Sequence, residues 1–342
     1  MSQQQLPAVQ TVALLNAPNQ DLVIETQLKL PPIGENDVLV RNLYAGVNPL
    51  DVAFRRTGMY ISSYPAILGV DFSGIVAGVG SKVTQFKIGD SVSGCTFGDF
   101  RGTYAQYIVA PESMTFLNPS KLPHELTASV GVTFLTAYQI LLKYLPNDVE
   151  NVKEHKGSLK GKKILLIGGS GGVGLCAILL AKHYFQATEI VSISSNRNIE
   201  FLTKLGVDRV LDYSKGKDHL INELETLKDH FDLVADLIGG YHEYYHVEIL
   251  KKDQESQFVS IIPHNAKQNS GKVFGCERTF TLIASGSRIQ YENILNFLAE
   301  NENVWKQIPL HVFKLENVMQ AHDLSESKRT VGKIILEIPQ TL

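Results

Sequence analysis

The sequence predicts an α/β protein in two parts, a β-rich first part followed by a parallel sheet with helices. Short β-prone runs broken by Gly, Pro, Asn and Asp fill about the first 130 residues. From Lys163 onward, apolar strand-like runs alternate with helix-like runs, which is typical of a parallel sheet with right-handed crossovers. A glycine-rich turn, 168–174, stands where the first of these strands meets the first helix.

The elements of the first part are short strands and one helix. Strands are expected at 37–47, 74–80 and 103–111. The apolar period then changes, so that 126–145 reads as a helix, and the lysine-rich stretch after it reads as a loop.

The second part alternates strictly. A strand at 163–167 is followed by a helix over 172–185, and a later helix ends at Gly206, a residue that favours a C-cap. The chain finishes with a helix-like run and a strand that we expect to return to the first part. The remaining expected strands are 189–193, 209–213, 232–238, 257–262, 280–285 and 331–338, and the remaining helices are 198–206, 217–228 and 315–327.

Composition excludes several classes of protein. The formal net charge is −3 and no block of Lys or Arg is long, so nucleic acid is not an expected partner. The N-terminus lacks the pattern of a secretory signal, and no apolar run is long enough to span a membrane. Three widely spaced cysteines without a C-x-x-C pair indicate reduced thiols and no cysteine-based zinc site. We therefore expect a cytoplasmic protein.

The glycine turn predicts a dinucleotide site. Gly168, Gly171 and Gly174 lie between a strand and a helix, where backbone free of side chains can approach a pyrophosphate at a helix N-terminus. The surrounding strand–turn–helix–strand pattern makes this much more specific than the glycines alone.

The residues about twenty positions further on indicate which nicotinamide cofactor binds. NAD enzymes place an acid there against the ribose 2′-hydroxyl. This chain instead has Ser194, Ser195, Asn196 and Arg197, and no carboxylate. Small hydroxyls and an arginine suit a 2′-phosphate, so the sequence favours NADPH. The alternative is that Ser195 or Asn196 only caps a helix and Arg197 is a surface residue.

Residues 168–172 also fit G-x-S-x-G, the turn that presents a nucleophilic serine in α/β-hydrolases. Ser170 would be the nucleophile, and Asp236 and His264 follow it in the chain order of those enzymes. The serine-presenting turn of α/β-hydrolases does not need a glycine at the position of Gly174, however. The α/β units that usually precede that turn are also missing from this sequence. Ser170 is better explained as a phosphate-contacting or turn hydroxyl.

The run HEYYH at 242–246 fits the zinc-protease pattern H-E-x-x-H. The pattern is short, and no third ligand stands out after it. A solvated helix start explains it better, and no metal is expected.

An ordered set of segments resembles the medium-chain dehydrogenase/reductase superfamily, in particular its zinc-free, quinone oxidoreductase-like branch. Within that branch the chain looks most like fungal and plant chloroplast-envelope quinone oxidoreductase homologues. The segments follow the family's order over nearly the whole chain: 48–60 (NPLDVAFRRTGMY), 68–94, 102–111, 135–141, 164–182, 194–213, 231–240 and 332–338.

The resemblance implies a GroES-like, β-rich catalytic domain formed by 1–127 and completed by 287–342. A Rossmann dinucleotide-binding domain, with its doubly wound parallel sheet, would be inserted at 128–286. Zinc-dependent members need a cysteine and a His-Glu pair where this chain has Asn48 and the run from Gly69 to Asp71. The resemblance therefore implies chemistry without zinc.

The resemblance also implies hydride transfer from NADPH to a quinone or an α,β-unsaturated carbonyl. Expected catalytic residues are Asn48, Tyr60 and Arg56, whose side chains could stabilise the developing oxyanion. The alternatives are a turn residue at Asn48, a packed ring at Tyr60 and an Arg56–Asp51 pair.

The expected cofactor residues follow the turn and the carboxyl ends of the strands. The resemblance places Thr136, or Thr133 in its stead, near the nicotinamide, and Tyr213 with Arg197 near the 2′-phosphate. The full set is Thr136, Gly168, Ser170, Gly171, Gly172, Val173, Gly174, Ser195, Arg197, Tyr213, Ile238 and Pro263.

The sequence thus predicts an NADPH-dependent, zinc-independent reductase of a small hydrophobic carbonyl or quinone. The alternatives are a carbonyl reductase and an NADPH-binding protein with little turnover that acts as a binding protein. Peripheral association with a membrane, an organelle or a lipid droplet and a homodimer are further expectations from relatives of this branch.

Overall fold

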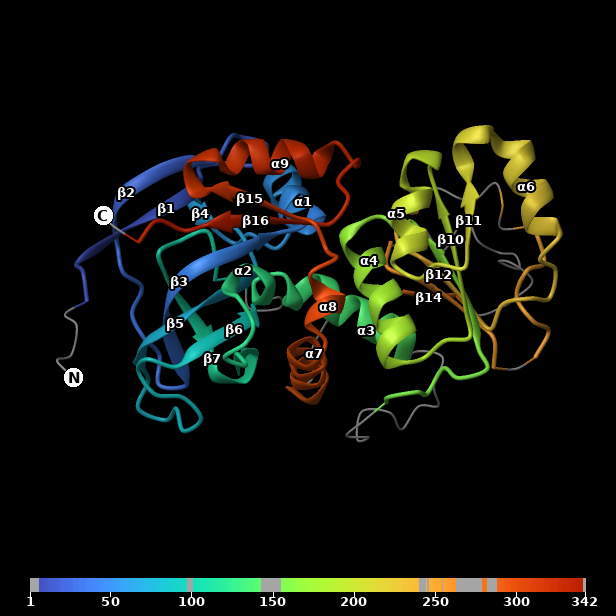
Figure 1. Cartoon of the computed structure of the whole chain (residues 1–342). Coiled ribbons are helices and arrows are strands. Elements are labelled where there is room, and N and C mark those ends of the chain that lie inside the picture. Colours follow the sequence, from blue (N-terminus) through green and yellow to red (C-terminus); the bar gives the residue numbers. More distant parts are fainter. Residues whose placement is uncertain are drawn as a thin grey trace. The chain divides into compact units, whose positions relative to one another are not determined.

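The computed structural model describes residues 6–96, 101–142, 155–239, 244, 246–253, 255–262, 279–281 and 288–340. The chain divides into two compact units, both drawn in Figure 1. The first consists of Met1–Val132, Ser285–Glu302 and Ile308–Leu342, so both ends of the chain contribute to it. The second consists of Thr133–Ala284 and Asn303–Gln307. The expected domain boundaries at 127/128 and 286/287 stay a prediction.

The first unit contains two sheets. Its larger sheet has the order β15-β16-β3-β5-β6-β8, with β7 pairing β3, and its smaller sheet has the order β2-β1-β4. The pairings are antiparallel except that β15 and β16 run parallel. The strands are β1 (Val9–Leu15), β2 (Val23–Lys29), β3 (Asp37–Val47), β4 (Ala66–Ile67), β5 (Asp71–Val79), β6 (Ser91–Cys95), β7 (Tyr107–Pro111), β8 (Thr115–Leu117), β15 (Leu310–Lys314) and β16 (Lys333–Glu337).

Short helices accompany these sheets. α1 (Pro49–Thr57) begins after Asn48 and ends at Gly58, whose φ of 72° suits glycine. It contacts α9 (Val318–Glu326), which comes just before the final strand. The others are α2 (His124–Thr127) and α7 (Arg288–Glu300), while α8 (Glu302–Trp305) begins in this unit and continues into the second. The sequence did not predict a helix at α7.

The second unit is built on one parallel sheet, as the sequence predicted. Its order is β11-β10-β9-β12-β13-β14, and all its pairings are parallel. The chain starts at β9 in the middle, fills one side and then the other, so the order reverses between β9 and β12. The strands are β9 (Lys163–Ile167), β10 (Glu189–Ser194), β11 (Arg209–Asp212), β12 (Leu233–Asp236), β13 (Gln257–Ser260) and β14 (Thr279–Thr281).

Helices connect these strands. The expected helix over 172–185 is α4 (Gly172–Leu179), which continues into a π-helical turn at Leu180–Tyr184. The remaining helices are α3 (Leu135–Leu142), α5 (Ile199–Lys204) and α6 (Lys217–Glu225). Within the part of the chain that the structure describes, no helix is both long and apolar enough to cross a bilayer.

The expected helix over 126–145 is interrupted. α2 ends at Thr127, a π-helical turn covers Val130–Phe134, and only then does α3 begin. The Asp71 carboxylate accepts a hydrogen bond from the Val132 amide at 2.9 Å. A side chain at Gly131 would collide with the same carboxylate, so glycine is required there. The contact with Asp71 accounts for the irregular backbone, and it comes from a strand that local pattern cannot see.

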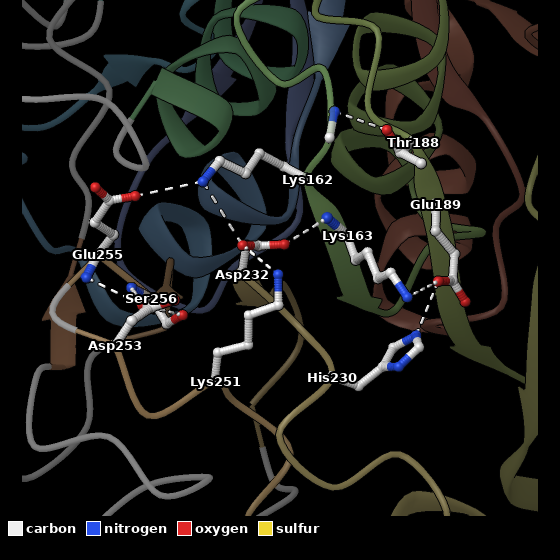
Figure 2. A network of polar contacts seen from close by, with 11 residues as sticks. Lys162, Lys163, Thr188, Glu189, His230, Asp232, Lys251, Asp253, Glu255 and Ser256 are labelled. Carbon is white, nitrogen blue, oxygen red and sulfur yellow. Dashed lines mark hydrogen bonds and ion pairs between the residues drawn. The ribbon is translucent and has the colours of Figure 1, made fainter.

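A polar network closes the amino edge of the parallel sheet (Figure 2). Asp232, which is buried, accepts hydrogen bonds from the Lys163 backbone amide at 2.8 Å and from Lys251 Nζ at 2.7 Å. Lys163 Nζ and His230 Nε2 both lie near Glu189, at 3.3 and 2.8 Å. The network joins the starts of β9, β10 and β12 at the edge opposite the glycine turn.

Candidate functional site

The glycine turn follows β9 at the carboxyl edge of the sheet. Gly168 has a φ of 95°, and its amide donates to the Ile193 carbonyl of β10 at 3.1 Å. The chain then turns so that the Gly171 amide donates to Gly168 O at 3.2 Å, and α4 begins at Gly172. The turn therefore lies at the point where the strand order reverses, and it leads directly into a helix N-terminus.

Three of these glycines are required by the protein's own packing. A Cβ at Gly169 would lie closer than 3.0 Å to Ser192, and one at Gly174 equally close to the backbone of Gly168 and Gly169. Gly168 is required by its positive φ. At Gly171 the nearest atom to an added Cβ is Gly168 O at 3.6 Å, an ordinary contact. Gly171 is thus a glycine of this turn that internal packing does not explain.

The end of β10 carries the residues expected near the 2′-phosphate. Ser195 is buried and its hydroxyl accepts from Asn198 Nδ2 at 3.4 Å, within the short turn that β10 runs into. Arg197 lies in the same turn and is exposed. Ser195 thus helps to shape the turn, and Arg197 points its charge to solvent from it.

The end of β11 lies beside this turn. Ser194 and Asp212 are paired residues at the ends of β10 and β11, and Tyr213, 42% exposed, follows Asp212. Burial raises the pKa of Asp212, but hydrogen bonds from the Ser214 side chain and backbone and from the Asn196 backbone outweigh it and hold that pKa below its usual range. Asp212 therefore joins the turns that carry Arg197 and Tyr213.

The end of β12 closes over the glycine turn. Asp236 Oδ1 accepts from the backbone amides of Ile238 at 3.1 Å and Gly239 at 2.9 Å. Ile238 is 48% exposed, and its side chain is what a Cβ at Gly168 would strike. Of the other expected cofactor residues, Thr136 and its alternative Thr133 are both buried. Pro263 lies outside the described residues.

The structure describes only some residues of the two alternative motifs, the G-x-S-x-G turn with its possible partners and the HEYYH run. The Ser170 hydroxyl accepts from Ser194 Oγ at 3.3 Å, and Asp236 Oδ1 accepts from the backbone amides that follow β12. His264 lies outside the described residues, as do His242 and Glu243 of the HEYYH run. Among the residues that are described, no three His, Cys, Asp or Glu side chains form a group that could hold a metal ion.

In the first unit, the expected substrate-facing segment 48–60 begins inside the protein. Asn48 is 1% exposed and precedes α1, and its backbone amide donates to Asp51 Oδ2 at 2.7 Å. Its side-chain Nδ2 donates to Asp71 Oδ2 at 3.0 Å and to Asp51 Oδ2 at 3.3 Å. Both hydrogens of the Asn48 amide are therefore directed at carboxylates.

A buried lysine completes this group. Lys333, at the start of β16, is 4% exposed; its ammonium donates to Asn48 Oδ1 and lies 3.2 Å from Asp71 Oδ2. Lys333 was not predicted from the sequence, because 285 residues separate it from Asn48. The signal available was a lysine opening an otherwise apolar strand, where a charge needs a buried partner.

The other two expected catalytic residues, Arg56 and Tyr60, differ in their contacts and in their exposure. Arg56 makes two hydrogen bonds to the Glu326 carboxylate, both of 2.6 Å, and one to Asn19 Oδ1 at 2.8 Å. The partner considered from the sequence was Asp51, but the structure gives Glu326 of α9. Tyr60 is 62% exposed with a φ of 63°, and its ring meets Phe54 edge-on with centroids 5.7 Å apart.

The buried carboxylates of this group affect each other. Burial, with the neighbouring charge of Asp71, raises the pKa of Asp51 to about 7, although Asn48 and Lys333 lower it. Burial and the charge of Asp51 raise the pKa of Tyr104 well above its usual value. Asp51 therefore carries a proton over much of the range below neutrality, and Tyr104 stays a neutral phenol.

Comparison with known proteins finds similarity over most of the chain. Residues 34–120 match the family model described as alcohol dehydrogenase GroES-like domain, and residues 205–336 match the one described as zinc-binding dehydrogenase. A 2-methylene-furan-3-one reductase of Solanum lycopersicum is 30% identical over 329 residues, which cover 92% of this chain and 75% of the relative. The chain belongs to the medium-chain dehydrogenase/reductase superfamily. It is accordingly an oxidoreductase, with the GroES-like and Rossmann-type parts that the sequence predicted.

Two further proteins are similar to this chain in sequence or in structure. An NADPH-dependent alkenal/one oxidoreductase of Arabidopsis thaliana, a chloroplastic protein, is 32% identical over 64% of this chain and 54% of its own length. The solved structure of a quinone oxidoreductase from Coxiella burnetii has a TM-score of 0.78 and 26% identity over 97% of this chain and all of that one.

Proposed function

We propose that this member of the superfamily is an NADPH-dependent, zinc-independent reductase of quinones or α,β-unsaturated carbonyls. The observation that carries the proposal is the carboxyl edge of the parallel sheet. There an open glycine, Gly171, adjoins a helix N-terminus, and the exposed Arg197 follows the end of β10. A nicotinamide dinucleotide supplies hydride when it is bound, and the relative of Arabidopsis thaliana named as NADPH-dependent supports this cofactor.

The choice of NADPH rests on charge. β10 ends at Ser194 and Ser195 follows it, so no carboxylate stands where the 2′-hydroxyl of NADH would be recognised. Arg197 brings a guanidinium, which pairs well with a phosphate. Asp212, the nearest carboxylate along the neighbouring strand, is occupied by Ser214 and is buried. It therefore shapes this edge through the hydrogen bonds that its Oδ1 accepts from Ser214.

The substrate class rests on the relatives' names and on the residues of segment 48–60. The relatives are named for a methylene-furanone, for alkenals and enones, and for quinones, compounds that share a carbon–carbon double bond conjugated to a carbonyl group. Hydride addition to such a bond leaves negative charge on that oxygen, which a hydrogen-bond donor stabilises. Tyr60 suits this role best of the three expected residues, since its ring is exposed. Asn48 would first have to give up a carboxylate, and Arg56 would have to leave Glu326.

Zinc independence rests on the chemistry of Asn48 and Asp71. These positions, which the resemblance matches to zinc ligands, are hydrogen-bonded to each other and to the Lys333 ammonium. An amide is a poor zinc ligand, and a metal ion there would be repelled by the buried ammonium beside it. The residues present thus do not fit a zinc ion, although one matching family model is described as zinc-binding.

Absorbance of NADPH at 340 nm tests the proposal. Consumption by wild-type protein with 2-hexenal or 1,4-benzoquinone, insensitive to prior chelation, supports a zinc-independent reductase. A Tyr60→Phe variant should then lose about tenfold in kcat with unchanged NADPH affinity, because only the oxyanion donor is removed. NADPH binding without turnover of either substrate would point to a binding protein, and activity that a chelator abolishes would contradict zinc independence. The cytoplasmic location, the homodimer and the lipid-surface association stay predictions.

A further inference from the structure

The inference concerns Lys333 and the polar group around it, which we call the lysine cluster: Lys333, Asn48, Asp51, Asp71 and Tyr104. Its members come from β16, the start of α1, β5 and the segment before β7, and all are almost wholly buried. A buried ammonium is costly unless it is paired and hydrogen-bonded, and Lys333 has both Asp71 and Asn48 as partners.

Charge fixes the orientation of the Asn48 amide within the cluster. Its oxygen accepts from the ammonium, and its nitrogen donates to the two carboxylates. Turning the amide over would place N–H groups against the ammonium and its oxygen against Asp51 and Asp71. Both changes are unfavourable in a buried site, where electrostatic interactions are strong. A single orientation is therefore imposed by the three charged neighbours.

This orientation bears on the segment that follows. Asn48 stands immediately before α1, and Asp51, its partner, lies in the first turn of that helix. α1 ends at Gly58, and two residues later the chain reaches Tyr60 in a left-handed conformation. The start of the segment is thus held by the last strand of the chain, and its end carries the donor expected to face the substrate.

We propose that Lys333 is a positioning residue, which holds Asn48 and the start of α1 so that segment 48–60 presents Tyr60 in its working conformation. The role in turnover rests on the proposed reductase function. The structural part, the holding of segment 48–60, does not. Lys333 touches neither substrate nor cofactor in this account, and it acts through Asn48.

Three variants distinguish a positioning role of Lys333 from a role in balancing the buried charges of the lysine cluster. Lys333→Met removes the ammonium and leaves the buried Asp71 carboxylate without its cationic partner, so it is expected to be unstable. The double variant Asp71→Asn with Lys333→Met removes one charge of each sign, and so restores balance without restoring the ammonium. Lys333→Arg keeps a cation and donors in a different shape, and should recover part of what Lys333→Met loses.

Lys251→Met serves as the matched control. Lys251 also pairs with a buried aspartate, Asp232, but at the amino edge of the parallel sheet in the other unit (Figure 2). Its loss should lower thermal stability without altering kcat or the exchange of segment 48–60.

The measurements are thermal unfolding, NADPH affinity, kcat and KM with 2-hexenal, and backbone hydrogen exchange of peptides covering 48–60. We expect the double variant to unfold close to the wild-type temperature and to bind NADPH normally. Its kcat should nevertheless fall about tenfold, with faster exchange confined to 48–60. Wild-type kcat in the double variant, or unchanged exchange in 48–60, would overturn the proposal. If the wild type reduces neither 2-hexenal nor 1,4-benzoquinone, the reductase function fails instead, and the exchange measurement alone decides whether Lys333 holds the segment.

Discussion

Gly171 and Gly174 lie three residues apart in one turn, yet their surroundings differ. An added Cβ at Gly174 would collide with the backbone of the turn, whereas at Gly171 it would make one contact at 3.6 Å. The φ of Gly171, −74°, also suits alanine. The fold therefore requires glycine at Gly174 but not at Gly171, for which we propose a contact with a bound phosphate.

Alanine should affect different properties at these two positions, NADPH binding at Gly171 and stability at Gly174. Gly171→Ala should keep the wild-type unfolding temperature but weaken NADPH binding by about tenfold or more, because a methyl group blocks the close approach of the pyrophosphate. Gly174→Ala should destabilise the protein by about 1–3 kcal/mol through overpacking. Thermal unfolding and fluorescence titration measure both. If Gly171→Ala binds NADPH with the affinity of the wild type, a pyrophosphate does not contact this turn.

Asp51 predicts a pH dependence of stability. Its pKa rises from 3.8 to about 7 on folding, so between these values the folded state binds more protons than the unfolded one. The free energy of unfolding should therefore fall as pH rises from about 4 to about 7, and Asp51 should add no further slope above that. The charge of Asp71 increases this effect, and Lys333 reduces it.

Asp51→Asn tests this slope. An amide oxygen can still accept from the Asn48 backbone, and the variant carries no charge to bury. Relative to wild type, the variant should gain stability progressively from pH 4 to pH 8, on the order of a few kcal/mol at most. Urea unfolding across this range measures the difference. A constant difference would show that Asp51 has the same pKa in the folded and unfolded protein.

At the scale of elements, the parallel sheet separates binding from stability. Its carboxyl edge carries the glycine turn and Arg197, and its amino edge is closed by the Asp232 network (Figure 2). Asp232 receives one backbone amide and one lysine and so joins the starts of several strands. A change at this edge should affect folding and leave the cofactor site unaltered.

Asp232→Ala provides that change. It leaves the Lys163 amide without its acceptor, while Lys162 and Lys251 are partly exposed and can turn to solvent. The variant should lose about 2–3 kcal/mol of stability and keep its NADPH affinity within about twofold. A large loss of affinity in protein that is still folded would contradict the separation of the two edges.

At the scale of the whole molecule, local pattern was enough for the parallel sheet, because buried strands, glycine turns and helices alternate in steps that a short window reveals. The same windows could not foresee the break at Val130–Phe134, where Asp71 binds the Val132 amide from a distant strand. They also missed α7, whose apolar residues are fewer and mixed with polar ones.

The candidate site also has a part that local sequence pattern predicts and a part that it does not. The turn at 168–174 and the residues after β10 were predictable because each lies within one strand–turn–helix unit. The lysine cluster was not, because it joins Asn48, Asp71 and Lys333 across nearly the whole chain. The roles assigned to Asn48, Tyr60 and Arg56 stay predictions, and the structure adds that Arg56 pairs with Glu326.

We propose that the carboxyl edge of the sheet binds NADPH through a contact of Arg197 with the 2′-phosphate. Fluorescence titration of wild-type protein and Arg197→Ala with NADPH and with NADH tests it most directly. Lys204→Ala is the control, since it removes a nearby exposed cation that pairs with Glu200. The account predicts that Arg197→Ala loses about tenfold or more in NADPH affinity, keeps its NADH affinity, and differs in this from Lys204→Ala. Equal binding of both nucleotides by the wild type, or an NADPH affinity that survives the loss of Arg197, would contradict it.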